Sequence, residues 1–301
     1  MILKTLVIMK TLHILFAAAA LAACLSCSKS QALQTEVRDY ADSTAHSYLT
    51  MHAELPIPAD AASKAIRTSL IAMMDSQLSQ IAPGEPQRYF PPFEGNPDDT
   101  EALLGYYKDQ TLAQIGKLSQ DDADDRERYV REDEELSEEQ KAEILSNIPS
   151  WGYDFKLEKI IDTTAYVVFQ SLNYIYMGGA HGGVTGEGFL TFDKKTGQQV
   201  KQMLDPACVG EIQPLLIKGL TGYYAECGYQ MSEEELKQHL MLEGDLIPLP
   251  AWALYPTADG LNFVYQQYEI ASYADGMPSF TLPVDDVQAW LTPEAKAILD
   301  R

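Results

Sequence analysis

A glycine-rich turn around a single histidine constrains this chain more than any other segment. The run from Tyr174 to Gly197 contains an aromatic strand, five glycines placed around His181, and a second strand. Glycine adopts positive φ without steric cost, so His181 is expected on a tightly folded loop with few side chains. Two interpretations stay open: the imidazole belongs to a recognition loop, or it only caps backbone groups. The residues predicted to make exposed contacts are Tyr176, Gly178, Gly179, His181, Gly182 and Gly183.

The segment before this turn has the pattern of a β-hairpin. Apolar residues at Tyr153, Phe155 and Leu157 alternate with polar ones, and the next strand, Ala165 to Met177, follows a short turn. Strands joined by a short turn pair antiparallel. Two later strands are expected at about 251–255 and 261–270.

Helices are predicted before and after the hairpin in the sequence. A strand from His46 to Leu55 precedes an amphipathic helix from Pro58 to Ile81. Asn96 is predicted to cap a further helix, with Pro97 at its first position. Later helices are expected at Cys208 to Cys227, after Ser232 and after Thr292. Helices grouped beside an antiparallel sheet give an α+β fold.

The spacing of the two late cysteines predicts that they are unpaired. A helix between Cys208 and Cys227 would hold them roughly 20 Å or more apart at about 1.5 Å per residue. A disulfide needs Cα atoms within about 7 Å.

The segment from Asp121 to Glu143 is strongly acidic. It holds twelve acids and four bases, a net charge of 4 − 12 = −8. A calcium loop is one interpretation, but the glycine and the bidentate glutamate that such a loop needs are out of register. A solvated connection, inserted into the domain and entering a short helix capped by Ser137 with Gln140, is favoured.

The first residues predict export and lipid attachment. Lys4 and Lys10 precede the short apolar run from Leu12 to Ala23, which is typical of a signal peptide. The sequence Leu21-Ala22-Ala23-Cys24 follows the lipobox pattern, so Cys24 is the predicted lipidation site, and a plain secretory peptide is the alternative. The start is Met1 or Met9. Predicted divisions are 1–23 signal peptide, 24–41 tether, 42–150 strand–helix subdomain and 151–301 C-terminal domain. The predicted location is the cell envelope, anchored to a membrane by lipid.

The charge of the whole chain limits its partners. The formal net charge is −22, and removing two signal-peptide lysines gives −22 − 2 = −24. Such a chain repels phosphate backbones, so nucleic acid is not an expected partner. It attracts basic proteins, although the charge also serves solubility.

Motifs for catalysis are missing from the mature sequence. It contains no His-Glu-x-x-His, no His-x-x-x-His and no Gly-x-Ser-x-Gly. No cofactor, metal or catalytic residue is therefore predicted, and a carboxylate pair such as Glu187 with Asp193, acting on a glycan, remains the enzymatic alternative. Aromatic groups with polar tips suit the binding of sugars or proteins; the candidates are Tyr174, Tyr176, His181, Tyr265, Tyr268 and Tyr273.

Three motifs resemble one known family. They are Gly178-Gly-Ala-His-Gly182, the turn from Phe192-Asp193 to Thr196-Gly197, and the run from Leu261 to Gly276. Over about Trp151 to Leu291 the chain resembles the RsiV-like extracytoplasmic domain, found in a lysozyme-sensing anti-sigma factor and in the non-catalytic region of a peptidoglycan deacetylase. The resemblance implies an α+β envelope domain that binds a lysozyme-like basic protein or peptidoglycan. Thr191-Phe192-Asp193 is also similar to the metal-binding Thr-Phe-Asp-Asp motif of polysaccharide deacetylases, but here Lys194 replaces the second aspartate.

Overall fold

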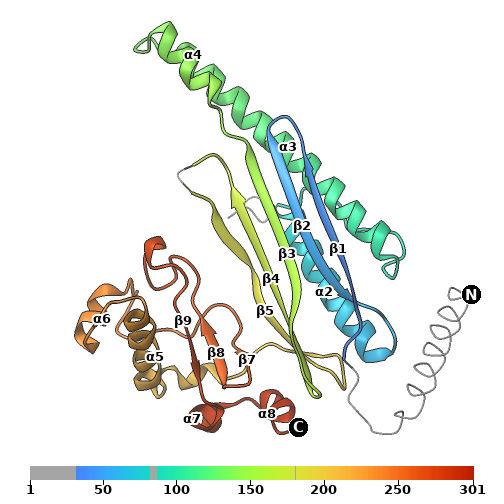
Figure 1. The fold of residues 1–301 in the computed structure, drawn as a ribbon, viewed down its shortest axis with the longest axis vertical. Coiled ribbons are helices and arrows are strands. Elements are labelled where there is room, and N and C mark those ends of the chain that lie inside the picture. Colours follow the sequence, from blue (N-terminus) through green and yellow to red (C-terminus); the bar gives the residue numbers. More distant parts are fainter. Residues whose placement is uncertain (1–31, 82–86, 180) are drawn as a thin grey trace, which may run out of the picture. The chain divides into compact units, whose positions relative to one another are not determined.

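A computed structural model of the chain describes residues 32–81, 87–179 and 181–301 (Figure 1). Leu33–Arg301 form one compact unit. The predicted signal peptide and Cys24 lie outside the described residues. Within the part that is described, no helix has the length and apolar character needed to cross a membrane.

The main sheet has six strands in the order β1-β2-β3-β4-β5-β6. Neighbours pair antiparallel except β2 and β3, which run parallel. A second sheet has the order β7-β8-β9 and is antiparallel. The strands are β1 Thr35–Ser43, β2 Ser47–Pro56, β3 Trp151–Asp162, β4 Tyr166–Tyr176, β5 Gly183–Asp193, β6 Gln199–Val200, β7 Tyr255–Pro256, β8 Leu261–Val264 and β9 Ser279–Leu282.

Helices lie beside the sheet in two groups, and the predicted α+β class is confirmed. The first group connects β2 to β3 and comprises α2 Ala61–Ser79, α3 Thr100–Glu132 and α4 Glu138–Ser146. The second group follows β6 and comprises η1 Pro206–Gly210, α5 Gln213–Glu226, α6 Glu233–His239, η2 Tyr273–Asp275, α7 Val284–Val287, η3 Gln288–Trp290 and α8 Pro293–Leu299. Figure 1 shows α2 and α3 along the sheet, with α5 beside β8 and β9.

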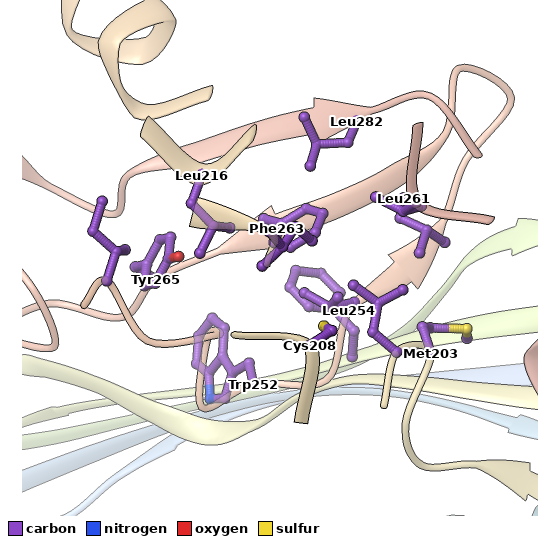
Figure 2. Packing of buried hydrophobic residues seen from close by; sticks show 14 of the residues in the cluster. Met203, Cys208, Leu216, Trp252, Leu254, Leu261, Phe263, Tyr265 and Leu282 are labelled. Carbon is purple, nitrogen blue, oxygen red and sulfur yellow. The ribbon is translucent and has the colours of Figure 1, made fainter. Parts of the chain in front are cut away.

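Alternate residues of β4 separate two hydrophobic cores, because successive side chains of a strand point to opposite faces. Val167 and Phe169 join the core formed with α2 and α3. Tyr166 and Val168 face the other core, built with the C-terminal elements. Figure 2 shows that second core, where Trp252, Phe263 and Tyr265 lie among aliphatic side chains from several elements. Both faces of the sheet are therefore buried at β4.

Several local signals are confirmed. Ser137 with Gln140 and Ser232 with Glu235 form capping boxes at α4 and α6. Thr292 caps α8. The predicted helix after Cys208 divides into η1 and α5, and both Cys208 and Cys227 are free thiols, as expected.

The predicted tether over 24–41 is wrong from Thr35 onward. Thr35–Ser43 forms β1, paired with β2 from Thr35 opposite Pro56 to Ser43 opposite Tyr48. This edge strand has no fully buried residue, and Arg38 and Asp42 bond instead to Glu101 and Lys108 of α3. The hydrophobic alternation that marks a strand is therefore absent from its sequence.

The predicted boundary between 42–150 and 151–301 is also wrong. β2 and β3 pair in parallel, from Ser47 opposite Trp151 to Ala53 opposite Leu157, so the sheet runs across that boundary. A parallel pair needs a crossover connection, here α2 to α4.

Two other element boundaries differ from the predictions. α3 begins at Thr100 with Asp99 as its cap, not at Pro97, because the Pro97 carbonyl accepts hydrogen bonds from the buried Arg67. The acidic residues from Asp121 to Glu132 belong to α3. This part of the segment is therefore helical, and it is neither the predicted solvated connection nor the calcium loop of the alternative.

The two late strands are shorter than predicted. The only strand residue of 251–255 is Tyr255, which begins β7, and β8 ends at Val264. Beyond Val264 the backbone leaves the strand to form the loop that carries Tyr268.

Candidate functional site

The connection between β4 and β5 carries His181 and is shaped by two of the predicted glycines. Gly178 has φ of 77°, and a Cβ there would lie 2.5 Å from Pro149. The Gly182 N–H donates to the Tyr174 hydroxyl at 3.1 Å, and a Cβ at Gly182 would lie 2.4 Å from the Tyr174 ring. Both glycines are therefore needed for close approach. A Cβ at Gly183 would meet nothing within 4 Å.

The His181 imidazole is exposed and held by three contacts. Its ring stacks on Tyr273, with centroids 3.9 Å apart and planes at 20°. Nδ1 lies 2.9 Å from the Gly182 carbonyl. A carbonyl only accepts, so Nδ1 carries the proton in that bond, and Nε2 accepts the longer 3.5 Å contact from the Tyr268 hydroxyl. His181 therefore makes local structural contacts and is also exposed to solvent, so both interpretations of the sequence stay open.

Tyr268 has a strained backbone and an exposed ring. Its φ of 65° is the one positive value among non-glycine residues that the structure describes, and its relative exposure is 56%. Left-handed geometry costs an L-residue roughly 1–2 kcal/mol, and such strain is concentrated at functional sites. The following residue, Glu269, holds the loop by accepting from the Gln266 and Ala251 N–H groups, each at 2.7 Å. Burial raises the pKa of Glu269 despite these two bonds.

Tyr273 is the first residue of η2, and hydrogen bonds to Asp275 hold this short helix in place. The Asp275 carboxylate accepts from the Ser272 hydroxyl and N–H and from His239 Nε2, the last at 2.7 Å. Burial opposes ionisation of Asp275, but these bonds outweigh it and hold its pKa below the usual value. The Tyr223 hydroxyl donates to the Asp275 carbonyl at 2.7 Å. These hydrogen bonds therefore fix the backbone that carries Tyr273.

We call His181, Tyr268 and Tyr273 the aromatic cluster. Tyr268 and Tyr273 lie 5.8 Å apart between ring centroids, and His181 and Tyr268 lie 6.5 Å apart. Sequence reasoning included both tyrosines among six aromatic candidates but did not place them against His181. Tyr265, another candidate, is fully buried and is excluded as a contact surface. Tyr176 ends β4, half-buried opposite Gly152, and has no ring contact with His181 among those described.

Gly186 and Gly188 belong to β5 and serve a different purpose from the loop glycines. The Trp252 indole donates to the Gly186 carbonyl at 3.0 Å. Gly188 has φ of 69°, and a Cβ there would lie 2.4 Å from the Trp252 ring. Gly188 thus makes room for the Trp252 ring, whereas Gly186 allows close approach to the Ser171 carbonyl of β4. Trp252 follows Ala251, whose N–H donates to Glu269, so these contacts connect β5 to the loop that carries Tyr268.

His181 differs in its contacts from two other histidines. His52 and His239 each lie 2.7 Å from a carboxylate oxygen, of Asp39 and Asp275 respectively. His181 instead contacts a backbone carbonyl and two tyrosines. Across residues 32–81, 87–179 and 181–301, no group of three or more His, Cys, Asp or Glu side chains is placed to hold a metal ion.

The enzymatic alternative named Glu187 and Asp193. The Glu187 side chain lies outside the described residues, and the Asp193 carboxylate accepts from Arg301 at 2.9 Å. Burial opposes ionisation of Asp193, but the bonds from Arg301 and the Lys195 N–H hold its pKa below the usual value. Asp193 is thus tied into the structure as an ionised partner of the C-terminal arginine.

Comparison with known proteins supports this fold. Residues 225–285, which include Tyr268 and Tyr273, match the family described as "Protein of unknown function (DUF3298)". A crystal structure of a DUF3298 member from Bacteroides fragilis NCTC 9343 has a TM-score of 0.61 at 16% identity, covering 91% of this chain and 100% of that one. One from Pseudomonas aeruginosa PAO1 has a TM-score of 0.55 at 14% identity, covering 88% and 97%. No curated protein gives a significant match.

Proposed function

We propose that this chain is a lipid-anchored cell-envelope protein that binds a lysozyme-like basic protein without catalysing a reaction. The observation that carries the proposal is the aromatic cluster, where Tyr268 is held exposed in a strained conformation. Tyrosine is enriched at the centres of protein interfaces, where one aromatic anchor contributes much of the binding energy. The formal charge of −22, or −24 without the signal peptide, favours a basic partner.

The resemblance to RsiV-like domains belongs to the same proposal. Two of its three motifs, Gly178–Gly182 and the run from Leu261 to Gly276, supply the whole aromatic cluster. These two motifs therefore meet in space at one exposed place. Peptidoglycan is the second candidate ligand, because stacked rings with polar tips also suit sugars.

Removing the Tyr268 ring tests the proposed binding. In Tyr268→Gly, we expect the affinity for a basic lysozyme to fall about tenfold, a loss of about 1.4 kcal/mol. Glycine accepts positive φ, so the free energy of unfolding should stay equal or rise. Calorimetric titration at low and high salt, beside a denaturant curve, measures both quantities.

Tyr229 provides the matched control, since it is 60% exposed but stands after α5 and outside the aromatic cluster. Tyr229→Gly should keep full affinity. Equal lysozyme affinity in Tyr268→Gly and wild type would contradict the proposal. If wild type turns over peptidoglycan instead, and His181→Ala abolishes that turnover, the glycan-acting enzyme is the correct alternative.

Lipid attachment has its own test. In Cys24→Ser we expect loss of radiolabelled palmitate and release of the protein from the membrane fraction, because serine lacks the thiol that accepts lipid. Cys27→Ser is the control, and it should remain labelled and membrane-bound. A wild-type protein that takes up no label would refute the anchor while leaving the binding proposal intact.

A further inference from the structure

A second exposed surface lies between the end of α3 and α4, remote in sequence from the aromatic cluster. Trp151, the first residue of β3, donates a hydrogen bond from its indole to Asp122 of α3. α3 continues for ten residues after Asp122, so it extends beyond this end of β3. Figure 1 shows this part of α3 together with α4 at one end of the chain's ribbon. We call residues 121–149 the acidic arm.

The acidic arm contains a hollow of about 510 Å³ with an apolar lining. Val130 is buried beneath it, whereas Tyr129 and Ile144 are 74% and 44% exposed. α4 has no buried residue at all. The apolar lining is formed by Tyr129, Val130, Ile144, Leu145, Ile148 and Pro149. A volume of roughly 300–1,000 Å³ is typical of a site that holds a ligand or several side chains.

The acidic arm as a whole is negatively charged, whereas the charged side chains that line the hollow are two carboxylates, Asp125 and Glu132, and two guanidiniums, Arg126 and Arg128. Each of the four bases between 121 and 143 forms an ion pair with an acid of the same segment: Arg126–Asp122, Arg128–Asp125, Arg131–Glu127 and Lys141–Glu138. Of the twelve acids, 12 − 4 = 8 form no ion pair within the described chain. Arg126 and Arg128, which line the hollow, are therefore each paired with a carboxylate, and the segment 121–143 keeps a net charge of −8.

These two properties point to one occupant. An apolar groove between two helices is filled by the apolar face of a third helix, with anchors spaced one turn apart. The excess of carboxylates along the acidic arm favours lysine and arginine on the rest of that helix. A second copy of this chain would bring the same −8 against it, and an anionic membrane or nucleic acid would also be repelled. We propose that the acidic arm binds a cationic amphipathic helix of a partner protein.

A synthetic helix tests this proposal directly. The probe is a labelled peptide of about 18 residues, five helical turns, with leucine on one face and lysine on the other. Fluorescence anisotropy should show binding that weakens as salt rises. In the double variant Tyr129→Ser, Ile144→Ser, we expect the dissociation constant to rise at least about tenfold.

Control variants distinguish binding in the groove from nonspecific hydrophobic binding and from binding at the aromatic cluster. Tyr229→Ser and Met241→Ser remove side chains that are 60% and 56% exposed elsewhere, and they should not change peptide affinity. Tyr268→Gly should also leave it unchanged, so this proposal and the lysozyme proposal fail independently. Circular dichroism of the double variant verifies that the helices persist.

Three results would overturn the proposal. The double variant could bind the peptide as tightly as wild type, which would place the peptide elsewhere. A peptide with glutamate in place of lysine could bind equally well, which would remove the role of charge. Sedimentation could show a dimer that the double variant loses, which would make the occupant a second copy.

Discussion

Replacing Arg67 by methionine is expected to lower the free energy of unfolding by about 3–5 kcal/mol, because it leaves buried acceptors without donors. Arg67 is 1% exposed. Its guanidinium donates to the Pro97 carbonyl at 3.0 and 2.7 Å, to the Pro56 carbonyl at 2.9 Å and to the Thr100 hydroxyl at 2.8 Å. One side chain thus joins the end of β2, the loop before α3 and the first turn of α3.

Equilibrium unfolding in denaturant measures the Arg67→Met effect. Arg38→Met is the matched control, because Arg38 forms exposed ion pairs with Glu36 and Glu101 and its loss should barely move the unfolding midpoint. Methionine keeps most of the volume of arginine, so a large loss reports hydrogen bonds rather than a cavity. Similar midpoints for the two variants would show that water reaches the Pro56 and Pro97 carbonyls.

Gly188→Ala is the second change with a large expected effect, a loss of about 2–4 kcal/mol. The backbone φ of 69° disfavours any L-residue, and the added Cβ would lie 2.4 Å from Cγ of Trp252. Trp252 is buried and packs on Phe189 edge to face, so its ring has little room to move. Thermal and denaturant unfolding measure the loss.

Gly183→Ala is the matched control in the same strand, since a Cβ there meets nothing within 4 Å. We expect its stability to stay close to wild type. Gly188→Ala should also weaken binding at the aromatic cluster, because a displaced Trp252 moves Ala251 and its bond to Glu269 beside Tyr268. A Gly188→Ala variant as stable as wild type would mean that the Trp252 ring can rotate away without moving the backbone of Ala251, and full binding would then be expected.

The local sequence predicted several elements correctly because their signals are short-range. The alternation at Tyr153, Phe155 and Leu157 marked β3, and those three side chains are buried. The capping boxes at Ser137 and Ser232 depend on residues three positions apart, so they are visible without a structure. The α+β class followed from these patterns.

The candidate site was predicted only in part. His181 was identified from the glycines around it, but its partners are about ninety residues later in the chain. Nothing in the local pattern distinguished the exposed Tyr268 from the buried Tyr265, because both lie in one aromatic run. The positive φ of Tyr268 also has no local signal, since glycine or asparagine normally marks such a position.

The residues alone therefore determined where helices begin, where a hairpin turns and how negative the chain is. Long-range pairing was decided by the tertiary structure alone. It placed the polar edge strand β1, joined β2 to β3 in parallel across three helices, and brought His181 against Tyr273. Contacts of this kind join residues that are far apart in the sequence, and they form only when the packing of the whole chain has brought those segments together.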